Sequence, residues 1–285
     1  MPNFIQVIIL ALVQGACELL PVSSSAHVII AEKFMGLHPS SPEMTMILVM
    51  LHTGTMFAVI FYFWKGWKKD YFSSASKLRD FIKQILIASV FTGIVGLILK
   101  EVIEKIFMSR VPNAQVEDLF SNLPLIAIAL AAVGIMIIYA GLQEKKVIQN
   151  NEIKVKHSIW IGIVQGICLP FRGFSRSGST ISTGLFFGLP KQKLEEFSFA
   201  LAVVLTPAVV AKEAYRLLKD HTLRSQVSTI HLFMPSIVGM IFSFIAGLLA
   251  LKLLSRWLEG GRWQWFGYYC LAASVGVMIA YFKMF

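Results

Sequence analysis

The chain has 285 residues, of which 56% are hydrophobic and 15% are charged, and its mean hydropathy is +0.69. A soluble domain rarely has so apolar a composition, so the sequence indicates an integral membrane protein surrounded by membrane lipids. The formal net charge of +10 comes mostly from Lys and Arg in short connections between apolar runs. That distribution reports membrane topology, and it gives no reason to expect a nucleic-acid partner.

The first apolar run, about residues 4–35, is interrupted by a polar turn with the sequence PVSSSAH at 21–27. A helix that breaks at mid-membrane must bury its freed backbone groups in protein or in a wet cavity. We therefore expect a re-entrant hairpin of two half-helices here. Because Pro21 ends one half-helix and the serines begin the next, backbone N–H groups and the positive end of a helix dipole would bind an anion. Residues 1–20 lack a basic n-region and a clean cleavage site, so no removable signal peptide is expected.

Six further apolar runs are each close to the ~20 residues needed to cross a bilayer. They cover about residues 45–64, 81–99, 123–140, 197–214, 234–254 and 264–283. The polar pair His52 and Thr53 lies inside the first of them and is interpreted as packing between helices. Cys17, Cys168 and Cys270 lie in apolar stretches without metal-ligand spacing, and are interpreted as small packing residues.

A second interrupted run, about residues 158–189, begins almost as the first does, since VQGIC at 164–168 matches VQGAC at 13–17. Three predicted crossings separate the two hairpins, so the halves have opposite orientations, as in inverted-repeat membrane proteins. We therefore predict an all-α polytopic membrane protein with six transmembrane helices plus two re-entrant helix hairpins. The chain would form one integral membrane domain, 1–285, with repeats at about 1–142 and 150–285.

The turn of the second hairpin has the sequence SRSGST at 175–180, which again predicts a helix N-terminus facing a cavity. Gly173 and Gly178 would let the backbone approach a ligand closely, and the planar guanidinium of Arg176 can bind two phosphate oxygens. Two anion-binding helix starts that face each other suit a diphosphate.

Lys and Arg are unevenly divided between the two sides of this arrangement. The side with connections 65–80, 141–157, 190–196 and 252–262 carries 15 of them, Lys83 included, and the other side carries 9. By the positive-inside rule the richer side is cytoplasmic. We therefore expect a multi-pass protein of the cell (inner) membrane with both termini, and the mouth of the first hairpin, outside.

The residues of the first hairpin suggest phosphate chemistry. Gln14 and Glu18 are one helical turn apart, and a carboxylate beside a phosphate needs a cation between them. Glu18 and Gln14 are therefore candidate ligands of Mg²⁺ or Ca²⁺, together with substrate oxygens. Ser24 and His27 are spaced to act as a hydroxyl nucleophile and its acid/base partner on one phosphorus atom.

Each of these residues also has a plainer interpretation. Glu18 could be a structural partner of Arg176 or Arg172, because a buried carboxylate needs a cation in any case. His27 could be a satisfied interior histidine, and Arg172 is either a second phosphate clamp or a lining residue. The turn serines could simply cap helices. The substrate-binding candidates are Ser23, Ser25, Arg172, Gly173, Ser175, Ser177, Gly178 and Thr180.

Both polar turns, in this order and in these halves of the chain, resemble the signature regions of the undecaprenyl-diphosphate phosphatases of the bacitracin-resistance type. The matching segments are QGACE at 14–18, PVSSSAH at 21–27 and GFSRSGST at 173–180. The resemblance implies a membrane hydrolase that converts undecaprenyl diphosphate to undecaprenyl phosphate and inorganic phosphate. Such an enzyme recycles the lipid carrier of peptidoglycan synthesis and confers bacitracin resistance. The resemblance also implies dependence on a divalent cation, an interdigitated inverted-repeat fold and a homodimer.

Carried over by position, the resemblance makes Glu18 the essential acid and Ser24 the favoured nucleophile. His27 matches the motif histidine, and Ser175 and Arg176 match the phosphate-binding pair. The choice between Ser24 and His27 as the attacking group stays open.

The sequence departs from the family pattern at two places. Gln14 stands where many members have Glu, which removes one possible metal-binding charge. Arg172 stands where Pro normally precedes the Gly, and Pro170 lies two residues earlier. The Ser-Arg-Ser-Gly core of the second motif is intact.

A transporter or flippase for a lipid phosphate is the competing hypothesis, because broken helices at the midplane are also a transporter architecture. A transporter needs the anion clamps, but it has no use for a nucleophile beside an acid/base residue and a metal-binding carboxylate. A purely structural membrane subunit would not explain polar groups concentrated in two matching breaks. The sequence therefore favours hydrolysis.

Overall fold

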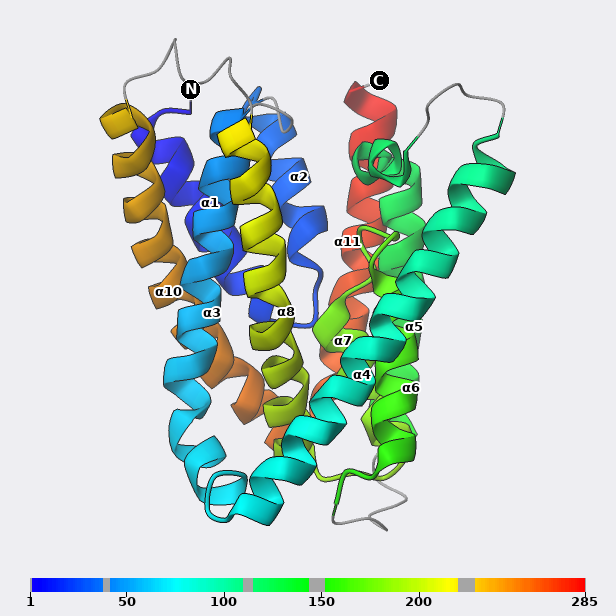
Figure 1. The fold of residues 1–285 in the computed structure, drawn as a ribbon. Coiled ribbons are helices and arrows are strands. Elements are labelled where there is room, and N and C mark those ends of the chain that lie inside the picture. The colour runs from blue at the N-terminus through cyan, green and yellow to red at the C-terminus, as the bar shows by residue number, and fades with distance from the viewer. Residues whose placement is uncertain (1, 38–41, 110–114, 144–151, 220–228, 285) are drawn as a thin grey trace.

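The computed structural model describes residues 2–37, 42–109, 115–143, 152–219 and 229–284. Within these ranges every regular element is a helix and no residue lies in a strand, so the predicted all-α class is confirmed (Figure 1). The longer helices are α3 (Pro42–Asp70), α4 (Ala75–Val102), α5 (Leu123–Gln143), α8 (Lys191–Lys219), α10 (Thr229–Glu259) and α11 (Trp263–Met284). The short π-helix η1 (Ile103–Phe107) continues α4, and the 3-10 helix η2 (Val116–Ser121) precedes α5.

Five segments of the described chain are long and apolar enough to cross a membrane. They are Met44–Asp70, Ala75–Phe107, Leu123–Gln143, Met234–Glu259 and Trp263–Lys283. These segments contain five of the six predicted spans. The remaining predicted span, about residues 197–214, lies within the 29-residue helix α8.

Both interrupted runs form pairs of short helices. The first pair is α1 (Phe4–Leu19) and α2 (Ser24–Phe34), and the second is α6 (Val155–Cys168) and α7 (Arg176–Phe186). Each of these helices is shorter than the ~20 residues that a bilayer crossing needs. Figure 1 shows the first pair opening toward the end of the molecule where both termini lie, whereas α6 begins at the opposite end. The two turns therefore approach each other inside the bundle.

The repeated VQG sequence has a packing role in both halves. α1 packs against α10 of the second half, and α6 packs against α4 of the first half. A Cβ atom on Gly15 would lie 2.5 Å from the carbonyl oxygen of Ser243 in α10, and one on Gly166 would lie 2.9 Å from that of Thr92 in α4. Glycine is thus required where each hairpin approaches a long helix closely, as is common between membrane helices.

Local sequence signals explain where several helices begin. The side chain of Asn3 accepts a hydrogen bond from the backbone N–H of Gln6 at 2.9 Å and caps α1. Ser74 caps α4 in the same way through the N–H of Lys77. The three cysteines of the chain are all free, and Cys270 is buried whereas Cys17 and Cys168 are partly buried.

Candidate active site

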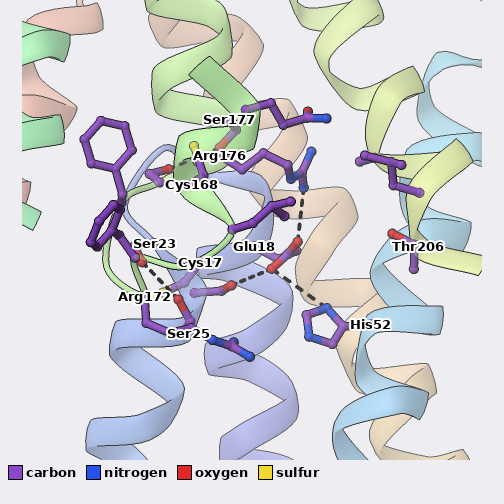
Figure 2. A pocket seen from close by; sticks show the side chains of 18 of the residues that line it. Cys17, Glu18, Ser23, Ser25, His52, Cys168, Arg172, Arg176, Ser177 and Thr206 are labelled. Atoms are coloured by element: carbon purple, nitrogen blue, oxygen red, sulfur yellow. Dashed lines mark hydrogen bonds and ion pairs between the residues drawn. The ribbon is translucent and has the colours of Figure 1, made fainter. Parts of the chain in front are cut away.

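The turns of the two hairpins line one cavity of about 280 Å³ (Figure 2). Glu18 and the serines at 23–25 come from the first turn, and Arg172 and Arg176 come from the second. α3 contributes His52, and α8 contributes Thr206 together with apolar residues. Much of the remaining lining is apolar: Val49, Leu169, Phe171, Phe174, Ala202, Leu205 and Val210. A small set of polar groups therefore converges in an otherwise apolar pocket, which is the usual form of a ligand site.

Glu18 joins the two halves of the site. Its Oε1 atom is 3.1 Å from a guanidinium nitrogen, Nη2, of Arg176. Its Oε2 atom accepts a short hydrogen bond from the hydroxyl of Ser24, and another of 3.2 Å from the side-chain amide of Gln14. Glu18 lies in the last turn of α1, Ser24 begins α2 and Arg176 begins α7. The sequence motifs of both hairpins thus meet at one carboxylate.

The serine turn has a strained backbone. Ser23 has φ of 66°, the left-handed region, which it alone occupies among the described residues other than glycine. Its side chain makes no capping hydrogen bond to α2, so the suggestion that Ser23 caps this helix is wrong. Its hydroxyl lies instead 3.3 Å from that of Ser25. The turn leaves Ser24 as the first helical residue, with its hydroxyl directed at Glu18.

The structure does not bring His27 to the Ser24 hydroxyl. The Nδ1 atom of His27 is 2.8 Å from the carbonyl oxygen of Ser23, so this nitrogen donates. The Nε2 atom then accepts from the hydroxyl of Tyr269, 2.7 Å away, and the two rings stack at 5.6 Å. His27 does not line the cavity. It holds the carbonyl of the strained turn residue in place.

Arg176 is positioned by the turn that precedes it. Ser175 caps α7, because its hydroxyl accepts a hydrogen bond of 3.2 Å from the N–H of Gly178. Gly173 has φ of 102°, and a Cβ there would lie 2.5 Å from the carbonyl oxygen of Ile126. The second guanidinium nitrogen of Arg176, Nη1, is buried without a hydrogen-bond partner in the described part of the chain. That nitrogen is an unused donor beside Glu18.

The other candidates of the second motif differ in their surroundings. Ser175 and Ser177 line the cavity, and the Ser177 hydroxyl is 3.4 Å from the carbonyl oxygen of Leu20 in the first turn. Gly173, Gly178 and Thr180 do not line it. Thr180 is buried, and its hydroxyl lies 2.9 Å from the carbonyl of Arg176 and 2.6 Å from the hydroxyl of Ser198. These contacts support the turn.

Arg172 also lines the cavity. Its guanidinium carbon lies 4.4 Å from the ring centre of Phe120 in η2, within the range of a cation–π interaction. The cavity therefore has two arginines, but Glu18 is the one carboxylate that lines it in the described part of the chain. The charged lining groups leave an excess of positive charge, which favours an anionic ligand.

His52 is a site residue that sequence reasoning assigned to helix packing. It lines the cavity, and its Nδ1 atom lies 2.9 Å from the amide nitrogen of Gln14 and 3.9 Å from Oε2 of Glu18. The signal available in the sequence was a histidine in the middle of an apolar span. That signal alone does not reveal that α3 faces the end of α1 at this position.

The donor set near Glu18 bears on the expected cation. No cluster of three or more His, Cys, Asp or Glu side chains able to hold a metal occurs among the described residues. Gln14 presents its amide nitrogen to Glu18, so ligation by Gln14 requires the amide to turn over. Mg²⁺ is often bound through one or two carboxylates with substrate phosphates and water completing its shell. The residues fit an ion bound in that way, through Glu18 and substrate oxygens.

Comparisons with known proteins relate nearly the whole chain to one protein family. Residues 7–276 match the family described as bacitracin resistance protein BacA. The chain is 55% identical to "Undecaprenyl-diphosphatase 2" of Acinetobacter baylyi, with 97% of each chain covered. It is 31% identical to a protein of the same name from Burkholderia ambifaria, over 94% of this chain and 93% of that one. It is also 28% identical to "Undecaprenyl-diphosphatase" of Methanosphaera stadtmanae, with 98% of each covered. The chain belongs to the bacitracin resistance protein BacA family, and it is a multi-pass helical membrane protein.

Proposed function

We propose that this family member hydrolyses undecaprenyl diphosphate to undecaprenyl phosphate and inorganic phosphate. The observation that carries the proposal is the contact chain from the Ser24 hydroxyl through Glu18 to Arg176, which joins a nucleophile, a base and a phosphate clamp in one cavity. The names of the relatives at 55%, 31% and 28% identity support the same substrate. In the cell the reaction would recycle the lipid carrier of peptidoglycan synthesis and confer bacitracin resistance.

The diphosphate would bind between the two hairpin turns. The unpaired Nη1 of Arg176 donates to the terminal phosphoryl group, and Arg172 offers a second guanidinium at the same cavity. The N-termini of α2 and α7 add their positive dipole ends. Ser23, Ser25, Ser175 and Ser177 are further hydroxyl donors along the lining. The apolar remainder of the wall suits the lipid end of the substrate.

Ser24 would act as the nucleophile and Glu18 as its base. The Ser24 oxygen attacks the terminal phosphorus while its proton passes to Glu18, and the bond to the bridging oxygen breaks. Glu18 gives that proton to the departing lipid monophosphate. Water then attacks the phosphoserine and loses a proton to Glu18, which returns a proton to the Ser24 oxygen as inorganic phosphate leaves.

A divalent cation, Mg²⁺ or Ca²⁺, would be held by Glu18 and by oxygens of the diphosphate, and Gln14 would join only with its amide reversed. When bound, it neutralises charge on the transferring phosphoryl group. Arg176 contacts the same carboxylate in the structure, and its positive charge would act on the diphosphate together with that of the cation.

In the membrane we propose six spans, including α8, with two re-entrant hairpins that enter from opposite faces as halves of an inverted repeat. The reciprocal packing of α1 on α10 and α6 on α4 supports this arrangement. The protein would lie in the cell (inner) membrane with both termini outside, and we propose a homodimer on the family resemblance alone.

The test is phosphate release from undecaprenyl diphosphate by the purified protein in detergent, with and without EDTA. We expect EDTA to abolish phosphate release by the wild type and excess Mg²⁺ or Ca²⁺ to restore it. The Ser24→Ala variant should release no phosphate at any cation concentration. Binding of the lipid without phosphate release under any of these conditions would favour a lipid-phosphate transporter instead. Phosphate release that is insensitive to EDTA would support the proposed hydrolysis and contradict the proposed role of a divalent cation.

A further inference from the structure

His52 is a polar residue in the middle of a membrane-length helix, and its side chain is not fully enclosed. It lies between the buried residues Leu51 and Thr55 of α3, yet 38% of its side chain is exposed, and it lines the cavity. Polar side chains inside membrane segments are costly and tend to serve a function. Packing alone therefore does not account for an imidazole that opens onto the candidate active site.

Gln14 fixes the tautomer of this imidazole. The amide nitrogen of Gln14 lies 3.2 Å from Oε2 of Glu18 and 2.9 Å from Nδ1 of His52. The opposite amide orientation would place a carbonyl oxygen against a carboxylate oxygen, so the NH₂ group must face both partners. Nδ1 of His52 then accepts a hydrogen bond, and the ring proton resides on Nε2.

The N–H at Nε2 points away from Glu18. Figure 2 shows the ring beside Glu18 with one nitrogen directed at that carboxylate. The second nitrogen lies across the ring and has no hydrogen-bond partner among the residues that the structure describes. Because His52 lines the cavity together with Arg172 and Arg176, this unpaired neutral N–H is a donor available to a ligand bound there.

We propose that His52, held as the Nε2–H tautomer by Gln14, donates a hydrogen bond to a non-bridging oxygen of the diphosphate. Phosphate oxygens are acceptors, and a neutral donor adds a directional contact without adding another positive charge next to the two arginines. The role given to Gln14 is thus to orient His52. This inference rests on the proposed function, because it names a further substrate contact at the same site.

Two substitutions of His52 distinguish the contributions of its two ring nitrogens. In His52→Asn the side-chain amide can replace Nδ1 but does not reach the position of Nε2. In His52→Gln the amide nitrogen can reach that position and donate. Thr53→Val is the matched control, because Thr53 is the next residue of α3, its hydroxyl bonds the carbonyl of Val49, and it does not line the cavity.

Two measurements are made on each variant in detergent. The first is the inorganic pyrophosphate concentration that half-maximally raises the melting temperature, in buffer with saturating Mg²⁺. The second is kcat/KM for undecaprenyl diphosphate. We expect His52→Asn to weaken pyrophosphate binding and to lower kcat/KM by about tenfold each, as for one lost hydrogen bond to a charged acceptor. His52→Gln should stay within about threefold of the wild type, since it keeps the donor, and Thr53→Val should match the wild type.

Equal values for His52→Asn and the wild type would overturn the proposal. Equal losses of pyrophosphate binding and of kcat/KM in the Asn and Gln variants would also overturn it, if both variants already have a lowered melting temperature without ligand. That result would indicate a structural role for His52. A wild type whose melting temperature does not respond to pyrophosphate would also contradict it. A wild type that binds pyrophosphate in a His52-dependent way but releases no phosphate from the lipid would retain this inference and refute the hydrolase.

Discussion

Replacing Glu18 with Gln tests the centre of the site with little change in side-chain volume. The carboxylate now accepts from Arg176 at Oε1 and from Ser24 and Gln14 at Oε2. A Gln side chain has one oxygen and one NH₂ group, so it can accept on one side only. If its oxygen keeps the contact with Arg176, its NH₂ faces the amide nitrogen of Gln14, and the Ser24 hydroxyl loses its acceptor.

The size of the expected effect follows from these contacts. Loss of a general base typically lowers a rate by ~10²–10⁴-fold, and Glu18→Gln also removes the negative charge that would hold the cation. Folding should suffer less, because a hydrogen bond to a charged group contributes ~1.5–3 kcal/mol and part of the network survives. We therefore expect at least a ~10²-fold fall in turnover with a protein that still folds in the membrane.

The assay compares phosphate release and melting temperature for the wild type, Glu18→Gln and Glu101→Gln in the same detergent. Glu101 is the matched control, because its carboxylate is 59% exposed and pairs with Lys105 on α4 and η1, and it does not line the cavity. Near-normal turnover of Glu18→Gln at saturating Mg²⁺ or Ca²⁺ would refute the role of Glu18 as base and cation ligand. A variant that loses activity only in proportion to lost folded protein would assign Glu18 to structure.

Two further predictions use the same detergent preparation, and a third uses intact cells. Arg176→Lys should lower turnover by ~10²-fold or more with little change in melting temperature, because Lys keeps the charge but loses the planar fork. If Arg176→Lys stays active and Arg176→Ala mainly loses stability, the positive charge of Arg176 has a structural role instead. His27→Asn should retain more activity than His27→Ala, since Asn can still donate to the carbonyl of Ser23, and equal losses would contradict the positioning role. In a cysteine-free background, Ser109→Cys in intact cells should react with an impermeant thiol reagent while Ser73→Cys does not, and the reverse pattern would invert the proposed topology.

Much of the fold could be predicted from the sequence because membrane burial has simple requirements. Apolar runs of about bilayer length predicted the long helices, and Pro and Ser in mid-run predicted the two breaks at 20–23 and 169–175. The repeated VQG sequence indicated two related halves. It did not indicate that Gly15 would pack on α10 and Gly166 on α4, because partners across the bundle depend on which helix faces are small.

The site was harder to predict where it depends on side-chain direction. Ser24 and His27 are three residues apart on one helix, and that spacing suggested a catalytic pair. The left-handed turn at Ser23 turns the hydroxyl of Ser24 to Glu18, while His27 bonds the backbone of the turn and Tyr269. His52 was assigned to packing because a contact between α3 and the end of α1 has no signature in the local sequence.

The two hairpins start from nearly the same sequence and then take different parts in the chemistry. Gln14 and Cys17 correspond to Gln165 and Cys168, but Glu18 corresponds to Leu169, which lines the apolar part of the cavity. An acid in both turns would place two carboxylates against a diphosphate, with like charges repelling the substrate. With one acid, the first turn supplies the proposed base and nucleophile, and the second turn supplies the arginines. The two hairpin turns thus bring the N-termini of α2 and α7 to one cavity, and the difference between the two sequences leaves an excess of positive charge there, which favours an anionic ligand.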